Sequence, residues 1–193
     1  MTDETGRLVQ SATAGNSVAI DGLLSRYLPE LHAFVRLRAG AAILGRETDE
    51  DLVQSVCREV LQDMDQFEYR GEKAFKKWLY LTAQNKLTDR ARYYRSQKRD
   101  VAREERIATR PDVYSGYRAL LSPSSAAVQQ EEIAALEGAF DRLPEEYRRV
   151  ITLAKILGMD SQELAQEFGR SVPATRMLLH RALARLAVVM TKS

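Results

Sequence analysis

Apolar residues recur every three or four positions along most of this 193-residue chain, which is the spacing that places them on one face of an α-helix. The first long stripe is Val18, Leu23, Leu24, Tyr27, Leu28, Leu31, Phe34, Val35 and Leu37. Pro29 lies inside this stripe and predicts a kink or a restart of the helix. No run of residues alternates apolar and polar in the way that a half-buried strand requires. The sequence therefore predicts an all-α protein.

A segment rich in Pro, Gly and hydroxyl residues divides the helical pattern into two blocks. We expect an N-terminal arm at 1–17, in which we find no motif, a helical domain at 18–106, a flexible linker at 107–127 and a second helical domain at 128–193. Each block has its own set of apolar residues, so we expect two small, separable domains. Part of the linker is expected to dock on another surface, because it contains Tyr114, Tyr117, Leu120 and Leu121.

The composition excludes several classes of protein. A single Cys cannot form an intramolecular disulfide, and with only two His it cannot complete a Cys/His zinc set. No apolar stretch approaches the roughly 18 residues of a membrane span, and the polar N-terminus does not resemble a signal peptide. No phosphate-binding glycine loop and no nucleophile or metal motif is present. We therefore expect a cytoplasmic protein that is not an enzyme, uses no catalytic residue, metal or cofactor, and does not insert into a membrane.

Charge is segregated along the chain, although the net charge is only +2. Residues 45–72 carry nine acids against three bases, and residues 73–110 carry twelve bases against four acids. A second group of acids, between 131 and 146, precedes a tail from 170 to 193 with five bases and no acid. Such blocks occur as solvated helix faces, but they also fit a protein with two kinds of partner, one of them a polyanion.

Residues 161–179 have the pattern of a helix-turn-helix, within predicted helices at about 128–142, 144–157, 161–168 and 172–190. Ser161 is predicted to cap the first of its helices, Gly169 to form the turn and Ser171 to cap the second helix. The outward face of that second helix carries Arg170, Ser171, Ala174, Arg176, Met177, His180 and Arg181. Because Arg and Ser donate hydrogen bonds to phosphates and base edges, this face predicts DNA binding, with a plain helical hairpin as the alternative.

Two helices of the first block have contrasting polar faces. The predicted helix from 73 to 99 combines cations with aromatic rings, and its outward candidates are Lys73, Lys76, Lys77, Tyr80, Gln84, Arg92, Tyr93 and Arg95. Cations track phosphates and aromatic rings stack on unpaired bases, so this helix and the loop 68–72 predict contact with single-stranded nucleic acid. Core packing is the alternative for Phe75, Trp78 and Tyr94. An acidic helix from 49 to 65, capped by Thr48, suits a protein partner through Asp51, Gln54, Ser55, Arg58 and Glu59.

Three segments, in chain order, resemble parts of bacterial RNA polymerase sigma factors. Residues 49–56 (DEDLVQSV) resemble the core-polymerase-binding helix, and residues 75–92 resemble the promoter-melting helix that reads the −10 element. The −35-reading domain is resembled by Leu143-Pro144, Arg148, Glu163-Leu164-Ala165, Gly169, Ser171, Arg181-Ala182 and Leu186. The short two-domain layout is similar to the extracytoplasmic-function (ECF) class, and the resemblance covers residues 18–104 and 128–190.

The resemblance implies a mechanism and the residues that serve it. Core RNA polymerase would be bound through Asp51, Gln54 and Arg58. The loop 68–73 would capture a flipped base, and the implied −10 contacts are Tyr69, Arg70, Lys73, Lys76, Lys77, Asn85, Arg90, Arg92, Tyr93 and Arg95. The segment 170–181 would enter the major groove of promoter DNA at the −35 element. Sigma factors of this class are often held inactive by an anti-sigma protein, which is a further expected partner.

Some positions depart from the family pattern, and other classes of protein stay open. Pro173-Ala174-Thr175 replaces a common Gly-Thr-Val and Leu183 replaces a common Arg, so the −35 base preference is left open. Cys57 replaces a large aromatic residue and is expected to be small and buried. A stand-alone helix-turn-helix regulator would leave the first block without a role. A helical nucleic-acid-processing enzyme is disfavoured, because no carboxylates cluster on one face as a metal-dependent nuclease needs.

Overall fold

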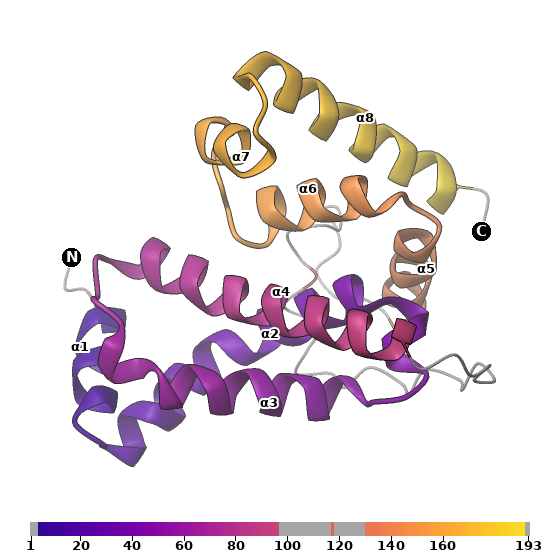
Figure 1. Ribbon diagram of the computed structural model, residues 1–193. Coiled ribbons are helices and arrows are strands. Elements are labelled where there is room, and N and C mark those ends of the chain that lie inside the picture. Colours follow the sequence, from indigo (N-terminus) through magenta and orange to yellow (C-terminus); the bar gives the residue numbers. More distant parts are fainter. Residues whose placement is uncertain (1–3, 97–116, 118–129, 192–193) are drawn as a thin grey trace.

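The computed structural model describes residues 4–96, 117 and 130–191, and every regular element in these ranges is a helix. The first block contains α1 (Glu4–Thr13), α2 (Ser17–Leu44), α3 (Asp49–Gln62), the 3-10 turn η1 (Met64–Gln66) and α4 (Glu72–Ser96). The second block contains α5 (Gln130–Asp141), α6 (Glu145–Lys155), α7 (Ser161–Phe168) and α8 (Val172–Met190). Figure 1 shows α1 to α4 gathered on one side of the molecule and α6 to α8 on the other. The all-α prediction is confirmed.

The N-terminal arm, in which the sequence shows no motif, forms α1 and packs on α2 (Figure 1). Thr5, Val9 and Ala12 are buried, at the spacing that places residues on one face of a helix. The hydroxyl groups of Thr5 and Tyr27 lie 3.0 Å apart and share a hydrogen bond. The arm is therefore part of the first helical unit.

The kink predicted at Pro29 is wrong, because α2 continues through this residue and departs from helical geometry at Gly40. Gly40 has φ 65° and ψ 170°, a conformation that residues with a Cβ atom rarely adopt. A Cβ atom here would also lie 3.2 Å from a side-chain nitrogen of Arg148. On either side of Pro29, Tyr27 and Leu31 are buried. The helix therefore continues past Pro29 with buried residues on both sides, although proline cannot make the backbone hydrogen bond to the preceding turn.

The start of α3 is as the sequence predicts. The Thr48 hydroxyl accepts a hydrogen bond from the backbone N–H of Asp51 at 3.1 Å and so caps the helix. The buried face of α3 consists of Leu52, Val53, Val56, Cys57 and Val60, and the helix packs against α2 and α4. Each such aliphatic side chain stabilises the fold by about 1.5–3 kcal/mol when fully buried. This face fixes α3 and leaves its opposite face polar.

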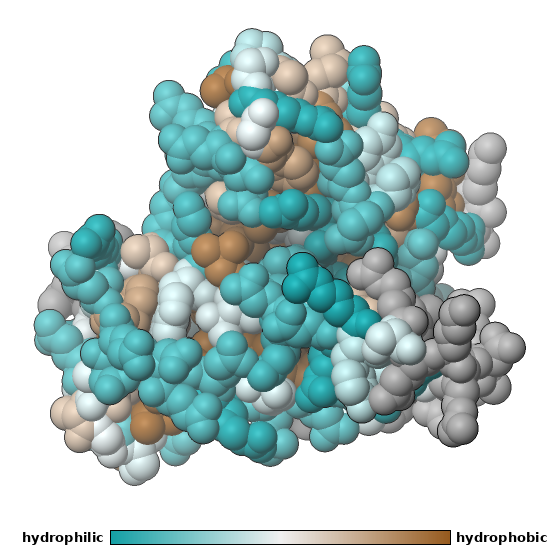
Figure 2. All heavy atoms as spheres, viewed as in Figure 1, coloured by the Kyte–Doolittle hydropathy of each residue, from teal (hydrophilic) through white to brown (hydrophobic). Residues whose placement is uncertain are grey.

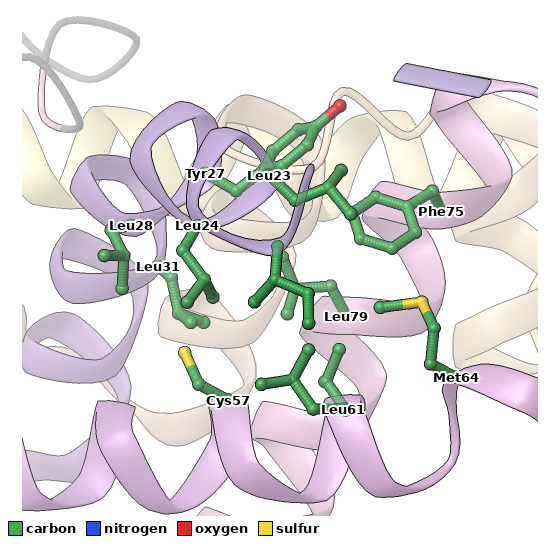
Figure 3. A pocket seen from close by; sticks show the side chains of 12 residues that line it. Leu23, Leu24, Tyr27, Leu28, Leu31, Cys57, Leu61, Met64, Phe75 and Leu79 are labelled. Carbon is green, nitrogen blue, oxygen red and sulfur yellow. The ribbon is translucent and has the colours of Figure 1, made fainter. Parts of the chain in front are cut away.

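A small apolar cavity of about 20 Å³ lies between α2, α3 and α4. In Figure 3, Leu24 and Leu31 of α2, Cys57 and Leu61 of α3 and Leu79 of α4 converge around it. Its apolar lining offers a water molecule no hydrogen-bond partners, so the cavity is a packing gap. Cys57 is buried, as predicted, and burial raises the pKa of its thiol to about 11.

The two helical blocks are in contact, and their buried residues form one continuous apolar cluster. Residues 33–40 of α2 are all buried, because α3 and α4 cover α2 on one side and α5 and α6 cover it on the other. The buried residues of the two blocks therefore meet across this contact, and the separability of the two domains stays a prediction. Tyr117 is fully buried, which confirms docking for this part of the predicted linker. The rest of 107–127, with Tyr114, Leu120 and Leu121, lies outside the described residues.

Candidate nucleic-acid interface

The helix-turn-helix consists of α7 and α8, joined by a turn at Gly169 with φ 60° and ψ 35°. Ser171 caps α8 as predicted, accepting a hydrogen bond from the backbone N–H three residues on at 3.4 Å. The predicted cap at Ser161 is wrong, because Asp160 caps α7. The Asp160 carboxylate accepts bonds from two backbone N–H groups at 2.9 and 3.0 Å, and the Glu163 carboxylate accepts the Asp160 N–H at 2.9 Å. This reciprocal capping box provides hydrogen-bond acceptors for more backbone N–H groups at the start of α7 than a cap at Ser161 would.

The outward face of α8 is exposed along its whole predicted set: Arg170, Ser171, Ala174, Arg176, Met177, His180 and Arg181. The opposite face is buried through Thr175, Leu178, Ala182 and Leu186. Arg176 Nε donates a hydrogen bond to the Ser161 hydroxyl at 3.2 Å, which ties α8 to α7. Met177 is 51% exposed, which is unusual for a large apolar side chain. The face therefore combines donors with an apolar contact.

An open groove lies between α6 and the start of α8. It is lined by Glu146, Tyr147, Arg170, Ser171, Ala174, Met177, Leu178 and Arg181. Arg170 pairs with Glu146 at 2.6 Å. Nothing in the sequence singled out Glu146 or Tyr147, because acids after a proline are also typical of any first helical turn. Figure 2 shows hydrophilic side chains over most of one face of the molecule, with smaller hydrophobic areas between them.

The polar face of α3 points away from the core. Asp51, Gln54 and Arg58 are exposed, at spacings of three and four residues that place them along one side of the helix. The Asp51 carboxylate also accepts a hydrogen bond from the Thr48 hydroxyl at 2.8 Å, so it takes part in the helix start. The side chains of Gln54 and Arg58 make no hydrogen bond or ion pair with the described part of the chain. Their polar groups are available to another molecule.

Aromatic rings surround the loop before α4. Phe67 stacks on Trp78 with ring centroids 4.5 Å apart and an interplanar angle of 15°, and it meets Tyr69 edge-on at 6.5 Å. Phe75 is buried and Trp78 is half-buried against the core, so the packing alternative holds for Phe75 and in part for Trp78. The sequence does not single out Phe67, because an aromatic residue beside a turn carries no distinct signal. Half-buried Tyr69 is the member of this group proposed from the sequence.

The cations at the start of α4 already have acidic partners. Arg70 pairs with Glu68 at 2.7 Å, and both side chains are well exposed. Lys73 pairs with Glu163 at 2.9 Å and with Asp160 at 3.5 Å, both at the start of α7. The hydrogen bond to Glu163 raises the pKa of Lys73. The first turn of α4 therefore contacts the helix-turn-helix directly.

The remaining candidates on α4 differ in whether they have an acidic partner. Three cations pair with acids: Lys76 with Glu30 at 2.7 Å, Arg90 with Glu47 at 3.2 Å and Arg92 with Asp89 at 3.7 Å. The side chains of Lys77 and Asn85 make no hydrogen bond or ion pair with the described residues. Tyr93 is 52% exposed. The side chain of Arg95 lies outside the described part of the chain.

Two residues predicted to face outward from α4 are packed inside the protein instead. Tyr80 is fully buried with its ring centroid 5.1 Å from that of Phe34, and its hydroxyl donates to Glu30 at 3.2 Å. Burial and the Glu30 carboxylate raise the pKa of Tyr80. Gln84 is half-buried and accepts a hydrogen bond from Arg38 Nε at 2.9 Å. α4 packs against both α2 and α3, so its buried face is wider than a single apolar stripe.

Two known domain families match the chain, one in each helical block. The family model of sigma-70 region 2 matches residues 23–99, and that of sigma-70 region 4 matches residues 132–186. The first range contains α3 and α4, and the second contains the helix-turn-helix. These two matches, together with the similar proteins below, define an RNA polymerase sigma factor of the sigma-70 type. The region 2 match accounts for the first block, which a stand-alone helix-turn-helix regulator would leave without a role.

Similar proteins narrow the class. ShbA of Streptomyces griseus, an ECF RNA polymerase sigma factor, is 30% identical over 192 residues, covering 95% of each chain. The ECF sigma factor SigD of Mycobacterium tuberculosis is 27% identical over 179 residues, covering 93% of this chain and 80% of that protein. The chain belongs to the ECF sigma factors, and it directs the initiation of transcription.

A solved structure shares the fold. CnrH, in complex with the cytosolic domain of CnrY, aligns with a TM-score of 0.63 and 22% identity over 99% of each chain. Among the described residues, no helix is suited in length and hydropathy to crossing a membrane. No three His, Cys, Asp or Glu side chains among them are grouped so as to hold a metal ion.

Proposed function

We propose that this sigma factor binds core RNA polymerase through the exposed face of α3. Asp51, Gln54 and Arg58 support this role, because they lie on one side of a helix whose other side is fixed in the core. The excess of acids around α3 repels DNA and suits a basic protein surface. Gln54 is the most informative of the three, since its side chain has no bond within the described part of the chain and is not part of a helix cap.

For the −10 element, we propose that the loop 68–73 holds a base that has left the stack. Tyr69 offers an aromatic ring beside Phe67, and Arg70 and Lys73 are exposed cations in the same loop and the first turn of α4. Further contacts along α4 are proposed for Lys76, Lys77, Asn85, Arg90, Arg92, Tyr93 and Arg95. Support is strongest for those described side chains, such as Lys77 and Asn85, that have no acidic partner among the described residues.

For the −35 element, we propose that the exposed face of α8 enters the major groove. The groove admits an α-helix, whose first turns reach the base edges. The proposed contacts are Arg170, Ser171, Ala174, Arg176, Met177, His180 and Arg181, and α8 carries no acid that would repel phosphate. Glu146 supports this arrangement, because it holds the Arg170 guanidinium at the edge of the protein groove between α6 and α8.

We further propose that an anti-sigma protein binds this chain. The relationship to ECF sigma factors supports this, and the similar structure of CnrH is a complex with the cytosolic domain of CnrY. Co-purification of a protein that suppresses transcription by the reconstituted holoenzyme would test the proposal. A chain that purifies alone from its host under all growth conditions would count against it.

The proposed residue roles depend on one observation, the order of three surfaces along the chain. The exposed face of α3 is followed by an aromatic loop with the cationic α4, and then by the helix-turn-helix. Run-off transcription with purified core polymerase and a genomic promoter library tests the whole assignment and reveals the promoter sequence. Transcripts that start without a shared pair of upstream elements would contradict it.

The polymerase contact has a sharper test in Gln54→Ala. A hot-spot contact predicts a loss of about 1–2 kcal/mol in core binding, which is roughly 5- to 30-fold. Gln62→Ala makes the same change at another exposed position of α3 and is the matched control. Equal binding of the two variants to core, at unchanged helicity, would show that the face of α3 around Gln54 is not the contact.

A further inference from the structure

The first helix, α1, is connected to the first residue of α4 through one buried tyrosine. Tyr27 of α2 is 4% exposed, and its hydroxyl donates to the Glu72 carboxylate at 3.0 Å. Because a phenol has one proton to donate, the Thr5 hydroxyl is the donor in its own 3.0 Å bond with Tyr27. Burial raises the pKa of Tyr27 to about 12, so the phenol keeps its proton at neutral pH. These bonds form a Thr5–Tyr27–Glu72 bridge from α1 to α4.

A second, exposed connection follows the same path. One terminal nitrogen of Arg26 pairs with Glu4 of α1 at 3.0 Å, and the other pairs with Glu72 at 3.4 Å. These three side chains are between 37% and 67% exposed, so water and salt screen both pairs and their contribution to stability is small. The buried Thr5–Tyr27–Glu72 bridge is therefore the stronger of the two connections.

The Tyr27 ring extends the bridge into the aromatic group beside the loop that precedes α4. Its centroid lies 5.2 Å from that of Phe75, which lies 5.8 Å from that of Phe67. Phe67 in turn stacks on Trp78 and meets Tyr69 edge-on. Figure 3 shows the Tyr27 ring beside Phe75, with its hydroxyl directed away from the apolar cavity. The hydroxyl of Tyr27 therefore connects the helices, and its ring packs within the group that contains Tyr69.

Both ends of the loop 67–71 are held from this side of the molecule. α1 packs against η1, which precedes the loop, and Glu72 follows the loop as the first residue of α4. In Figure 1, α1 lies beside the segment that leads into α4. Gly71 has φ 104°, a conformation that only glycine adopts readily. Because glycine leaves the backbone free to rotate at this point, the bonds to Glu72 limit where the loop can lie.

Glu72 is an acid within a segment proposed to contact DNA. It stands between Gly71 and Lys73, and its side chain is 45% exposed. A carboxylate here repels the phosphates that Lys73 attracts, so it does not suit a DNA contact. An acid in the first turn stabilises α4 through the helix dipole, but this does not require any partner. The two donors from α2, Tyr27 and Arg26, give the carboxylate a further role as an anchor.

We propose that the Thr5–Tyr27–Glu72 bridge positions the loop 68–73, so that α1 and α2 contribute to the choice of base at the −10 element without contacting DNA. The inference rests on the proposed function, which places an unstacked base in this loop. Bonds that hold a binding loop in place reduce the ordering that binding must supply. Their loss weakens binding of the base that fits the loop more than binding of a base that fits it poorly. Thr5, Tyr27 and Glu72 are positioning residues.

Removal of single hydroxyl groups tests the bridge. Tyr27→Phe keeps the ring beside Phe75 and removes the group that is bonded to both Thr5 and Glu72. Thr5→Val keeps the shape of the side chain and removes one bond, so it is the second variant where Tyr27→Phe loses helicity by circular dichroism. Thr13→Val is the matched control, because it makes the same change at an exposed position of α1 whose hydroxyl donates to a carbonyl of its own helix at 2.9 Å.

The order of the loop in the free protein is the first readout, and Trp78 reports it. Trp78 is the only tryptophan in the sequence, and it stacks on Phe67 at the start of the loop. We expect acrylamide to quench its fluorescence more efficiently in Tyr27→Phe and Thr5→Val than in the unsubstituted protein. Thr13→Val should leave the quenching unchanged. Equal quenching in all four proteins would overturn the positioning role.

Base preference of the reconstituted holoenzyme is the second readout. It is the ratio of initiation from a cognate promoter to initiation from a promoter with another base at the proposed unstacked position, so the amount of folded protein cancels. We expect a ratio roughly fivefold lower for Tyr27→Phe and for Thr5→Val, the factor that corresponds to one lost hydrogen bond. The −35 preference and the affinity for core polymerase should not change. An unchanged −10 ratio in both variants, or an equal loss of −35 preference, would overturn the inference.

Tyr69→Ala separates failure of this inference from failure of the proposed function. A loss of −10 preference in Tyr69→Ala, but not in Tyr27→Phe or Thr5→Val, would keep the loop as the base-reading element and overturn only the bridge. An unchanged preference in Tyr69→Ala would contradict the proposed function of the loop instead. The quenching of Trp78 would still decide whether the bridge positions the loop.

Discussion

The turn of the helix-turn-helix depends on one backbone conformation, which a pair of glycine substitutions can test. Gly169 has φ 60° and ends α7, with its N–H bonded to backbone carbonyls of that helix. Gly138 lies inside α5 and has no positive φ. A Cβ atom built at either position has no other atom within 4 Å. Gly→Ala therefore causes no collision at either site, and the two substitutions differ in backbone conformation.

We expect the two substitutions to change stability in opposite directions. At Gly169, a left-handed residue with a Cβ atom costs about 1–2 kcal/mol. The reduced freedom of alanine in the unfolded chain returns about 0.4–1 kcal/mol, so Gly169→Ala loses roughly 1 kcal/mol. Gly138→Ala should gain about 0.5–1 kcal/mol, because alanine is the better helix former. Gly169→Asn should lose less than Gly169→Ala, since asparagine tolerates the left-handed conformation.

Urea unfolding followed by circular dichroism measures both effects. With an m-value of about 2 kcal/mol per M, the midpoint should fall by about 0.5 M for Gly169→Ala and rise by about 0.3 M for Gly138→Ala. Shifts in the same direction, or a Gly169→Ala variant at least as stable as the unsubstituted protein, would refute the reasoning that the φ angle decides the sign.

Three further predictions follow from burial, charge and exposure. Cys57 is buried with its pKa raised to about 11, so its alkylation near neutral pH should be slow until urea unfolds the protein, and rapid labelling of the folded form would contradict its burial. Burial opposes the Asp49 carboxylate, but His32 and Arg36 outweigh it and lower the pKa of Asp49 on folding. Its contribution to stability is complete above about pH 4 and is lost as the pH falls through its lower folded value. Asp49→Asn should therefore flatten the acid side of a pH–stability profile. If Arg176 reads a guanine, Arg176→Ala should weaken promoter binding by roughly 1–3 kcal/mol and relax the preference at one base pair of the −35 element. If Arg176 contacts phosphate instead, the variant should lower the salt slope of promoter binding by about one unit. Unchanged transcription with an unchanged −35 profile would remove Arg176 from the site.

The helices of the second block are predictable because local chemistry sets their ends. The expected boundaries of α5 to α8 lie within two residues of those observed. Pro144 and Ser171 act within one turn of the helices they begin, so no tertiary contact is needed to find them. The predicted cap of α7 differs from the observed cap by one residue. Asp160 and Ser161 are both good N-cap residues, and only the capping-box geometry distinguishes them.

A single apolar stripe does not predict how many neighbouring helices pack against a helix, or how wide its buried face is. Apolar Phe75, Leu79 and Ala83 recur every four residues and form one stripe, which predicts Tyr80 and Gln84 on the outside of α4. Packing of α4 against two helices widens its buried face and includes both residues. The sequence does not reveal α1, because its buried face contains only a few small or polar residues. These residues are buried only because α2 packs against them.

The segregated charges serve a purpose inside the molecule that their pattern does not reveal. Arg36 and Glu137 pair across 101 residues of chain, and Lys73 of the basic block pairs with Glu163 of the helix-turn-helix. Acids that indicated an outside partner therefore neutralise cations of the same chain. A DNA phosphate that binds Lys73 would have to replace the carboxylates of Glu163 and Asp160. Salt screens the exposed Lys73 pair far more than the buried Arg36 pair, so we expect high salt to weaken the contact at Lys73 before it weakens the contact at Arg36.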